Sequence, residues 1–470
     1  MTLRKMRGAA SLCLACVLLP VTTLRAQGTD LSWRWHLQAG VNAVAEQQVF
    51  WRLADTTAPG SGYDVNKSWL EYYVKPGLSF ERGLADGQAL HGKVSVVSSY
   101  TQGTDAFDEG NVGATTLEEA YLGWKGQGDG DLAYDVSVGP RELRLGTGML
   151  VASGASSGFE RGALKFGPRK AWEKALIARM DARGYSGTVF QLSPNELPSS
   201  DGYNKLAGVD LRFDDAGGGF LGGTWLRVLD SESPYVQAAT AGLGAPTILT
   251  GARRGTEALS LYAKSSPMAD LPNWTFSADL AREWNPRIHL RAWAGRVQVH
   301  RAFPDLPGAP VLSYGYQSFS GDDPDTTALE RFDPLYYEGN PNAWSTGSKS
   351  SMAFINSNVN AHSVALRWQP SASDVLTLRY AHIRANRLRS PIQFGQASRV
   401  DTSGETASVV AGVTDPHLAD DLFLEYSRPL GPKVFLSAGV AISFPGRGIR
   451  EVTGSAHNWT GGFVNVVFNH

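Results

Sequence analysis

Three aspartates, Asp322, Asp323 and Asp325, lie close together in one short polar segment. Carboxylate oxygens in such a group can bind a hard cation such as Ca²⁺. The segment lacks the central glycine and the distal glutamate of a calcium-binding loop. It therefore favours a solvated turn or an internal salt bridge to Arg331. The sequence predicts no metal site and no cofactor.

Three histidines, His91, His362 and His382, lie in strand-like segments, and serines are plentiful. A Ser–His pair in the manner of a barrel phospholipase would use such residues for nucleophilic catalysis. No nucleophile motif accompanies them, however. The sequence therefore predicts a protein that is not an enzyme and has no catalytic residue.

Basic residues recur on the polar phase of alternating segments. The residues that this alternation places together are Lys93, Asp210, Arg212, Lys264, Arg367, Arg379 and Glu425. We assign Arg141 and Arg144 to the same face, although the alternation that would place them there is broken at Pro140. If this phase faces a pore, its basic groups lower the entry barrier for anions and repel cations. Alternatively, such charges pair with acids and only brace the wall, since barrel interiors are polar in any case.

The elements that would position these groups are β-strands. From Trp33 onward, apolar and polar residues alternate in segments of about ten residues that end at Gly, Asp, Pro or Asn. The clearest segments are residues 35–43, 90–100, 207–213, 259–264, 363–368, 376–380, 422–427, 434–444 and 463–468. Residues 169–180 are the one helix-like stretch, and we expect strand or loop there because the neighbouring segments are strand-like.

The connections between these segments differ in length. Tight links are expected at Gly431-Pro432 and Asn285-Pro286, and long loops at residues 230–255, 320–352 and 390–415. Short and long connections in alternation are typical of a transmembrane barrel, with periplasmic turns at one end and extracellular loops at the other.

Composition supports the same fold. The chain has 13 Trp, 16 Tyr, 19 Phe and 52 Gly, which suits many strands, tight turns and aromatic girdles. About 440 residues follow the leader, enough for about 16 to 18 strands at roughly 25 residues per strand and connection. We therefore predict an all-β, transmembrane antiparallel β-barrel of about 18 strands, with long extracellular loops and an aqueous channel. A soluble β-sandwich or β-propeller is the alternative, but it would rarely need so many aromatic residues at strand ends.

The first 26 residues have a basic start, an apolar centre and a small residue, Ala26, before a polar shift. This predicts a cleaved signal peptide over residues 1–26 and a single barrel domain over residues 27–470. Cleavage before Cys16, as in a lipoprotein, is the weaker alternative. Both cysteines, Cys13 and Cys16, lie in the leader, so the mature chain can form no disulfide. The net charge of −2 excludes a typical nucleic-acid binder.

Two stretches resemble the alginate export family of outer-membrane porins. The first joins Ser320-Gly321-Asp322-Asp323 to Arg331-Phe332-Asp333-Pro334-Leu335-Tyr336-Tyr337. The second, residues 138–146, resembles a family strand in which a Val-Gly-Arg-Gln type sequence leads to a Leu-Gly pair, although here Pro140 interrupts it. Asp322, Asp323, Arg331 and Asp333 then form the expected base of a loop at the pore mouth.

The resemblance implies a monomeric outer-membrane barrel with a basic constriction, and passive diffusion or export of an anionic polysaccharide or a related small organic anion. Expected partners are the lipid bilayer, the acidic solute, the barrel-assembly machinery and periplasmic polysaccharide-export proteins. The alternatives are a porin for neutral small solutes and, less favoured, a β-rich enzyme that acts on polysaccharide. The last strand departs from the usual barrel ending, because Asn469 and His470 follow the aromatic Phe468.

Overall fold

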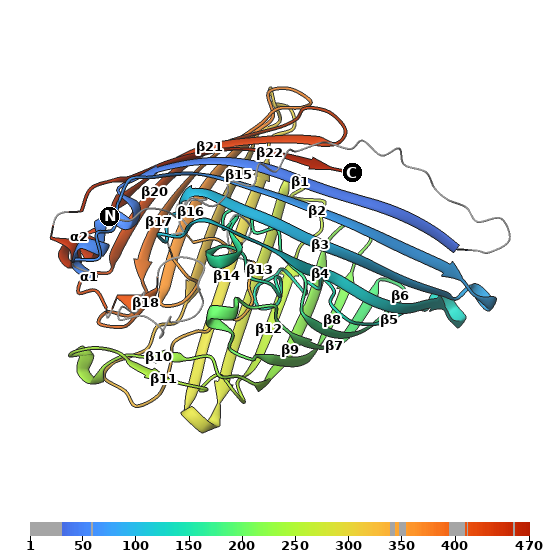
Figure 1. The fold of residues 1–470 in the computed structure, drawn as a ribbon, viewed down its shortest axis with the longest axis horizontal. Helices are drawn as coiled ribbons and strands as arrows, with labels where there is room; N and C mark the ends of the chain where they lie inside the picture. Colours follow the sequence, from blue (N-terminus) through green and yellow to red (C-terminus); the bar gives the residue numbers. More distant parts are fainter. Residues whose placement is uncertain are drawn as a thin grey trace, which may run out of the picture.

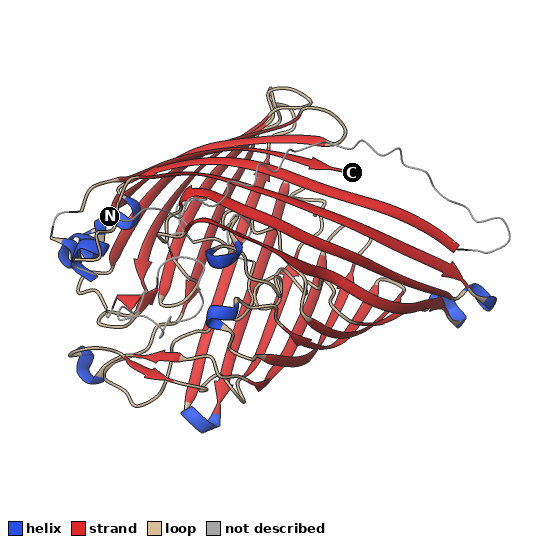
Figure 2. Ribbon diagram, viewed as in Figure 1, coloured by secondary structure: helices blue, strands red, loops and turns tan. Residues whose placement is uncertain are grey.

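The computed structural model describes residues 31–57, 60–338, 344–346, 354–393, 409–410, 412–454 and 456–470. The leader predicted over residues 1–26 lies outside this part of the chain. Strands make up nearly all of the regular structure, and they run around a closed wall (Figure 2). No helix in the described part of the chain is long and apolar enough to cross a membrane.

Eighteen antiparallel strands form the barrel, and this confirms the predicted fold. Each strand pairs with the next barrel strand along the chain, and β1 pairs with both β2 and β22, which closes the wall (Figure 1). The strands are β1 (Leu31–Gln47), β2 (Lys67–Gly83), β3 (Ala89–Thr104), β4 (Gly110–Gln127), β5 (Ala133–Val138), β6 (Lys174–Ala182), β7 (Tyr185–Ser193), β8 (Lys205–Asp214), β9 (Phe220–Asp230), β12 (Glu257–Lys264), β13 (Trp274–Asn285), β14 (Leu290–Ala302), β15 (Val311–Phe319), β16 (Val359–Trp368), β17 (Val375–Ala385), β20 (His417–Pro429), β21 (Val434–Pro445) and β22 (Trp459–Asn469).

The remaining elements are short and lie in the connections. They are the hairpin β10 (Tyr235–Gln237) and β11 (Thr247–Leu249), the pair β18 (Ile392–Gln393) and β19 (Val409–Val410), the helices α1 (Ala54–Thr57) and α2 (Arg447–Thr453), and the 3-10 turns η1 (Val49–Arg52), η2 (Ala85–Gly87), η3 (Asp129–Asp131), η4 (Phe159–Arg161), η5 (Pro198–Ser200), η6 (Thr240–Gly242) and η7 (Pro286–Ile288). The predicted stretch 169–180 is loop up to residue 173 and then β6, as expected.

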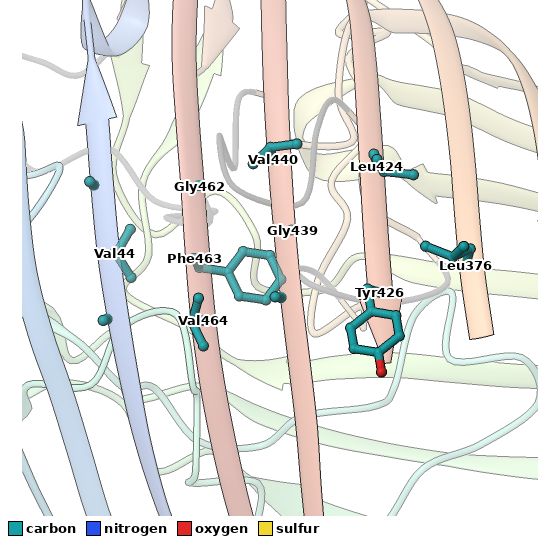
Figure 3. A pocket seen from close by; sticks show the side chains of 12 residues that line it. Val44, Leu376, Leu424, Tyr426, Gly439, Val440, Gly462, Phe463 and Val464 are labelled. Atoms are coloured by element: carbon teal, nitrogen blue, oxygen red, sulfur yellow. The ribbon is translucent and has the colours of Figure 1, made fainter. Parts of the chain in front are cut away.

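The apolar and polar residues that alternate in the sequence lie on opposite faces of the barrel wall. On β16, Val364 and Leu366 are exposed apolar residues of the outer face, so Arg367 between Leu366 and Trp368 points to the lumen. On the outer face of β20 to β22, the small residues Ala438 and Gly462 leave a shallow apolar hollow, which Figure 3 shows between Leu424, Val440 and Val464. An apolar outer face is what a wall in contact with lipid requires.

Short and long connections lie at opposite ends of the barrel. Links such as residues 183–184, 215–219 and 430–433 share one end, and residues 231–256, 320–358 and 386–416 share the other. The three predicted long loops are therefore confirmed. The tight link at Asn285-Pro286 is also present, but it lies at the long-loop end. Short turns mark the periplasmic end of an outer-membrane barrel.

One long connection was not predicted, and it is the one that shapes the pore. Residues 139–173, between β5 and β6, leave the wall and fold into the barrel, where Trp172 is fully buried. We call this segment the lumen loop. The described parts of the 320–358 connection also turn inward, and Trp344 in that connection is fully buried as well. The apolar core therefore sits inside the barrel, between these two connections and the wall.

The lumen loop begins at a strained turn. Gly139 has φ of +114°, and a Cβ atom built on it would lie 2.3 Å from the carbonyl oxygen of Ala120. Only glycine fits a backbone of this conformation at so close an approach. Pro140 follows and has no N–H group to donate, although its carbonyl still accepts a hydrogen bond from the N–H of Ala120 on β4 over 2.9 Å.

Gly139→Ala is expected to lower the free energy of unfolding by about 1–3 kcal/mol, because it adds backbone strain and a clash at once. Thermal unfolding of the purified barrel in detergent measures this loss. Gly431→Ala is the control, because a Cβ atom at Gly431 meets no other group. Equal stability of the two variants would show that the turn at Gly139 relaxes freely.

Candidate functional site

The lumen loop is fastened to the wall formed by β1 to β4. The ammonium of Lys165 forms a buried ion pair with Glu46 on β1, and the backbone N–H of Lys165 donates to Glu71 on β2 over 2.9 Å. The guanidinium of Arg169 donates to the hydroxyl of Ser99 on β3 over 2.8 Å. These contacts join residues far apart in sequence, so they hold the loop across one side of the lumen.

The other end of the lumen loop reaches β13. The hydroxyl of Thr147 donates to Asp279, whose carboxylate lies 3.0 Å from the guanidinium of Arg296 on β14. The same guanidinium lies 3.6 Å from the centre of the Trp344 ring. The lumen loop therefore spans the barrel from β1–β4 to β13–β14 and narrows the pore.

The second inward connection docks on the lumen loop. The backbone N–H of Ala152 donates to the carbonyl of Tyr336 over 2.8 Å, and the N–H of Tyr336 donates to Leu150 over 3.0 Å. The indole N–H of Trp344 donates to the carbonyl of Thr147 over 3.0 Å. Backbone pairing of this kind fixes the two connections to one another. Together they narrow the pore, and we call the place where they meet the constriction.

Arg144 lies at the junction of the two connections. Its Nη2 atom is 2.7 Å from Oε2 of Glu338, and its side chain keeps nearly half of its exposure. Lys170 lies on the same loop, and burial lowers the pKa of its ammonium, while Glu338 and Glu142 oppose that shift. The constriction thus holds one arginine in an ion pair with Glu338 and one lysine on which the charges of Glu338 and Glu142 act.

Lys93 and Arg141 lie together on the wall beside the start of the lumen loop. The Nζ atom of Lys93 is 2.5 Å from Oε2 of Glu119. The guanidinium of Arg141 lies 3.1 Å from Asp135 and 4.6 Å from the centre of the Tyr121 ring. Both predicted lumen residues therefore have acidic partners.

A second group of predicted residues lies on β8 and β12. The carboxylate of Asp210 accepts a hydrogen bond from the Tyr262 hydroxyl over 2.9 Å, and Arg212 pairs with Asp214 at 2.5 Å. Lys264 lies two residues beyond Tyr262 on the same face. Among the residues that the structure describes, Lys264 has no carboxylate partner.

The third group lies on three neighbouring strands, β16, β17 and β20. In register, Arg367 faces Thr377 on β17, and Thr377 faces Glu425 on β20. Arg379, two residues further along β17, lies over the ring of Phe423 at 5.5 Å. Within the described ranges, Arg367 forms no ion pair. Arg367 and Lys264 are therefore lumen-facing charges that form no ion pair with any described acidic residue.

The predicted loop base is buried, and its carboxylates are occupied by the protein itself. Asp322 accepts hydrogen bonds from the backbone N–H groups of Ala238 and Glu330, over 2.7 and 2.8 Å. Burial raises its pKa, and these bonds offset part of that shift. Asp323 lies 3.3 Å from the guanidinium of Arg387. The site therefore holds a loop in place.

Among the described residues, Arg331 forms no salt bridge with Asp322, Asp323 or Asp325, so the pairing expected from the sequence is wrong. The guanidinium of Arg331 donates to the side-chain carbonyl of Gln393, and burial lowers its pKa. Asp333 instead forms a bidentate pair with Arg253, at 2.6 and 2.9 Å. Burial opposes the charge on Arg253, but Asp333 raises its pKa above the ordinary value. The long 231–256 connection thus supplies the cation that pairs with Asp333.

Several groups of the constriction were missed from the sequence. Lys165 and Arg169 lie in the irregular lumen loop, where alternation gives no signal, and Arg296 lies on β14, which was not among the clearest segments. The break at Pro140 was the one available sign that the chain leaves the wall there.

A closed antiparallel barrel with an apolar outer face and a charged, narrowed lumen defines this protein as an outer-membrane channel. Residues 273–462 match the family model described as alginate export, which confirms the resemblance to that family over this region. The match and the fold point to a channel rather than an enzyme. No curated protein matches the chain.

Two solved outer-membrane proteins share the fold. OccK2 (OpdF) of Pseudomonas aeruginosa, solved in complex with glucuronate, has a TM-score of 0.50 and 10% identity, over 93% of this chain and 96% of that chain. OccAB4 of Acinetobacter baumannii has a TM-score of 0.51 and 9% identity, over 94% of this chain and 99% of that chain. At this identity the likeness shows the fold alone.

Proposed function

We propose that the channel conducts acidic saccharides, such as an alginate-like polysaccharide, or related organic anions through its lumen without energy coupling. The observation that carries this proposal is the pair of lumen-facing cations, Lys264 and Arg367, that have no acidic partner among the described residues. Positive groups in a narrow pore with low-dielectric walls concentrate anions and exclude cations. The family match over residues 273–462 supports a polysaccharide as cargo.

The constriction adds to this positive field. Arg144 is exposed to the lumen beside its partner Glu338, and Lys170 lies nearby on the same loop. An extended polyanion that passes this point would exchange its hydration water for contacts with such groups. Lys93, Arg141, Arg212 and Arg379 would then contribute as a second layer along the wall, with Asp210 and Glu425 setting their orientation.

One observation favours a porin for neutral solutes instead. Many of the predicted lumen cations are paired with carboxylates, as in Lys93–Glu119, Arg141–Asp135 and Arg212–Asp214. Paired charges brace a wall and contribute little net field. The two proposals differ in a property that can be measured, the ion selectivity of the open channel.

Arg367→Glu and Arg379→Glu are each expected to shift the reversal potential of the channel toward cation preference. The reason is that each change replaces a lumen cation by an anion on adjacent strands. Planar bilayer recordings under a salt gradient measure the shift, and the wild type should prefer anions. Arg428→Glu is the matched control, since Arg428 pairs with Asp374 and is exposed on the outer face of β20.

A cation-selective wild type, or a protein that forms no channel, would overturn the proposed cargo class. Unchanged reversal potentials in both lumen variants would favour the neutral-solute porin.

We further propose that residues 1–26 direct secretion and are removed, that residues 27–470 form one barrel domain, and that barrel-assembly and periplasmic polysaccharide-export proteins are its partners.

A further inference from the structure

Two imidazoles and a carboxylate meet on the outer wall of the barrel. The Nδ1 atom of His382 on β17 lies 2.7 Å from Oδ1 of Asp420 on β20, and the Nε2 atom of His417 lies 2.8 Å from Oδ2 of the same carboxylate. The ligand atoms of all three residues lie within 4.8 Å of one another. Each side chain keeps between 25% and 30% of its exposure, so the cluster is open to ions.

A β-bulge creates this cluster. In a regular strand, residues three apart point to opposite faces, so His417 and Asp420 should not meet. The pairing of β17 with β20 shifts register here, because Ile383 faces Ala419 whereas Arg384 faces His417. The extra residue, Leu418, is fully buried. The bulge therefore turns His417 to the face of Asp420, as bulges do where a side chain must be re-aimed.

The cluster lies on the outer face, at the border of the exposed apolar residues that is nearer the long-loop end of the barrel. Val364, Tyr380 and Leu422 are exposed on the outer face of β16, β17 and β20, and His382 and Asp420 occupy the next outward positions toward the long-loop end. The hydroxyl of Tyr380 also donates to Asp420 over 2.6 Å. Aromatic side chains of this kind gather where a barrel leaves the hydrocarbon layer, and on this ground we place the cluster near the lipid headgroups.

We propose that His382, His417 and Asp420 form a Zn²⁺ site on the outer wall of the barrel. Two imidazole nitrogens and one carboxylate oxygen are a set that zinc binds well, whereas Ca²⁺ and Mg²⁺ prefer oxygen ligands alone. Three protein ligands leave a fourth position for a water molecule. Zinc bonds of about 2.0–2.1 Å require ligand atoms only about 3.3 Å apart, so small ring rotations bring the three donors into place.

The proposed zinc site would join the two ends of a long connection. His382 lies just before the long 386–416 connection, and His417 and Asp420 lie just after it. A metal ion shared by β17 and β20 clamps both ends of that connection. Zinc then raises the unfolding temperature of the barrel, because it binds the folded state alone. This inference is independent of the cargo of the channel.

The test is zinc titration by calorimetry of the full-length barrel in detergent, purified without a polyhistidine tag. The wild type is expected to bind one Zn²⁺ per chain, with an affinity that falls at lower pH because protons compete for the imidazoles. His382→Ala, His417→Ala and Asp420→Asn should each weaken binding by about tenfold or more. Co²⁺ in place of zinc should give visible absorption bands of a four-coordinate site, and His417→Ala should abolish them.

His91→Ala is the matched control. His91 also contacts a carboxylate, Asp135, at 3.1 Å, but it lies in the lumen and shares that carboxylate with Arg141. In the part of the chain that the structure describes, it belongs to no group of three metal-ligating side chains. This variant should bind zinc as the wild type does. Heat-modifiable gel migration identifies any variant that fails to fold, and His417→Gln then replaces His417→Ala. A wild type that binds no stoichiometric zinc, or cluster variants that bind it unchanged, would show that these residues only hydrogen-bond to each other.

Discussion

Arg253→Leu is expected to destabilise the loop that carries the pore-mouth motif by about 3–5 kcal/mol. Arg253 is buried and forms a bidentate pair with Asp333, and the backbone N–H of Asp333 donates to Glu283 over 2.9 Å. Loss of the guanidinium leaves the carboxylate of Asp333 buried beside the carboxylate of Glu283, without a cation to compensate their charge. Urea unfolding followed by tryptophan fluorescence, with Trp344 as a probe in the same connection, measures the loss.

The double variant Arg253→Leu with Asp333→Leu separates two explanations of that loss. Replacing both partners of a buried pair by apolar groups removes the uncompensated charge, so most of the stability should return. If the double variant is as unstable as the single one, the shape of the two polar side chains matters more than their charge. A single variant within about 0.5 kcal/mol of the wild type would contradict the prediction.

Removal of the lumen loop is expected to increase the single-channel conductance by about twofold or more, because the loop spans the pore. The backbones of Arg141 and Trp172 pair through two hydrogen bonds, of 3.3 and 3.1 Å. Residues 144–169 can therefore be replaced by Asn-Gly, which closes a short hairpin between Leu143 and Lys170. The same change removes Arg144 and Lys165, so the preference for anions should decrease as well.

A shortened β10–β11 hairpin is the control for that deletion. Removing residues 241–244 shortens a long connection at the same end of the barrel without touching the lumen loop. Its conductance should equal that of the wild type. If the loop deletion also leaves conductance unchanged, the ionic path does not pass the constriction described here.

The barrel could be predicted from the sequence because its wall is a repeating physical pattern. Lipid on one side and water on the other force apolar and polar residues to alternate, and on β16 the exposed Leu366 and Trp368 flank Arg367, which points the other way. The long loops were visible for the same reason, since they interrupt the pattern. The leader and residues 394–408 of the third long loop lie outside the described residues, and the prediction of a cleaved leader is untested.

The interior of the pore could not be predicted in this way. The lumen loop has no period, so nothing in the sequence shows that Lys165 pairs with Glu46, more than a hundred residues earlier. Asp333 is near Arg331 in sequence, yet Asp333 forms its ion pair with Arg253. The proposed zinc site depends on a one-residue bulge at Leu418, and strict alternation would have placed His417 on the wrong face.

The two connections that form the constriction come from opposite halves of the chain. The lumen loop follows β5, and the segment that docks on it through Tyr336 follows β15. A chain that has inserted only its first nine strands therefore lacks the docking partner of its own lumen loop, and the narrow point forms only when the later strands arrive. The segment that completes the narrow point lies between the thirteenth and fourteenth of the eighteen barrel strands, so a barrel that lacked it would have a wider lumen than the complete channel.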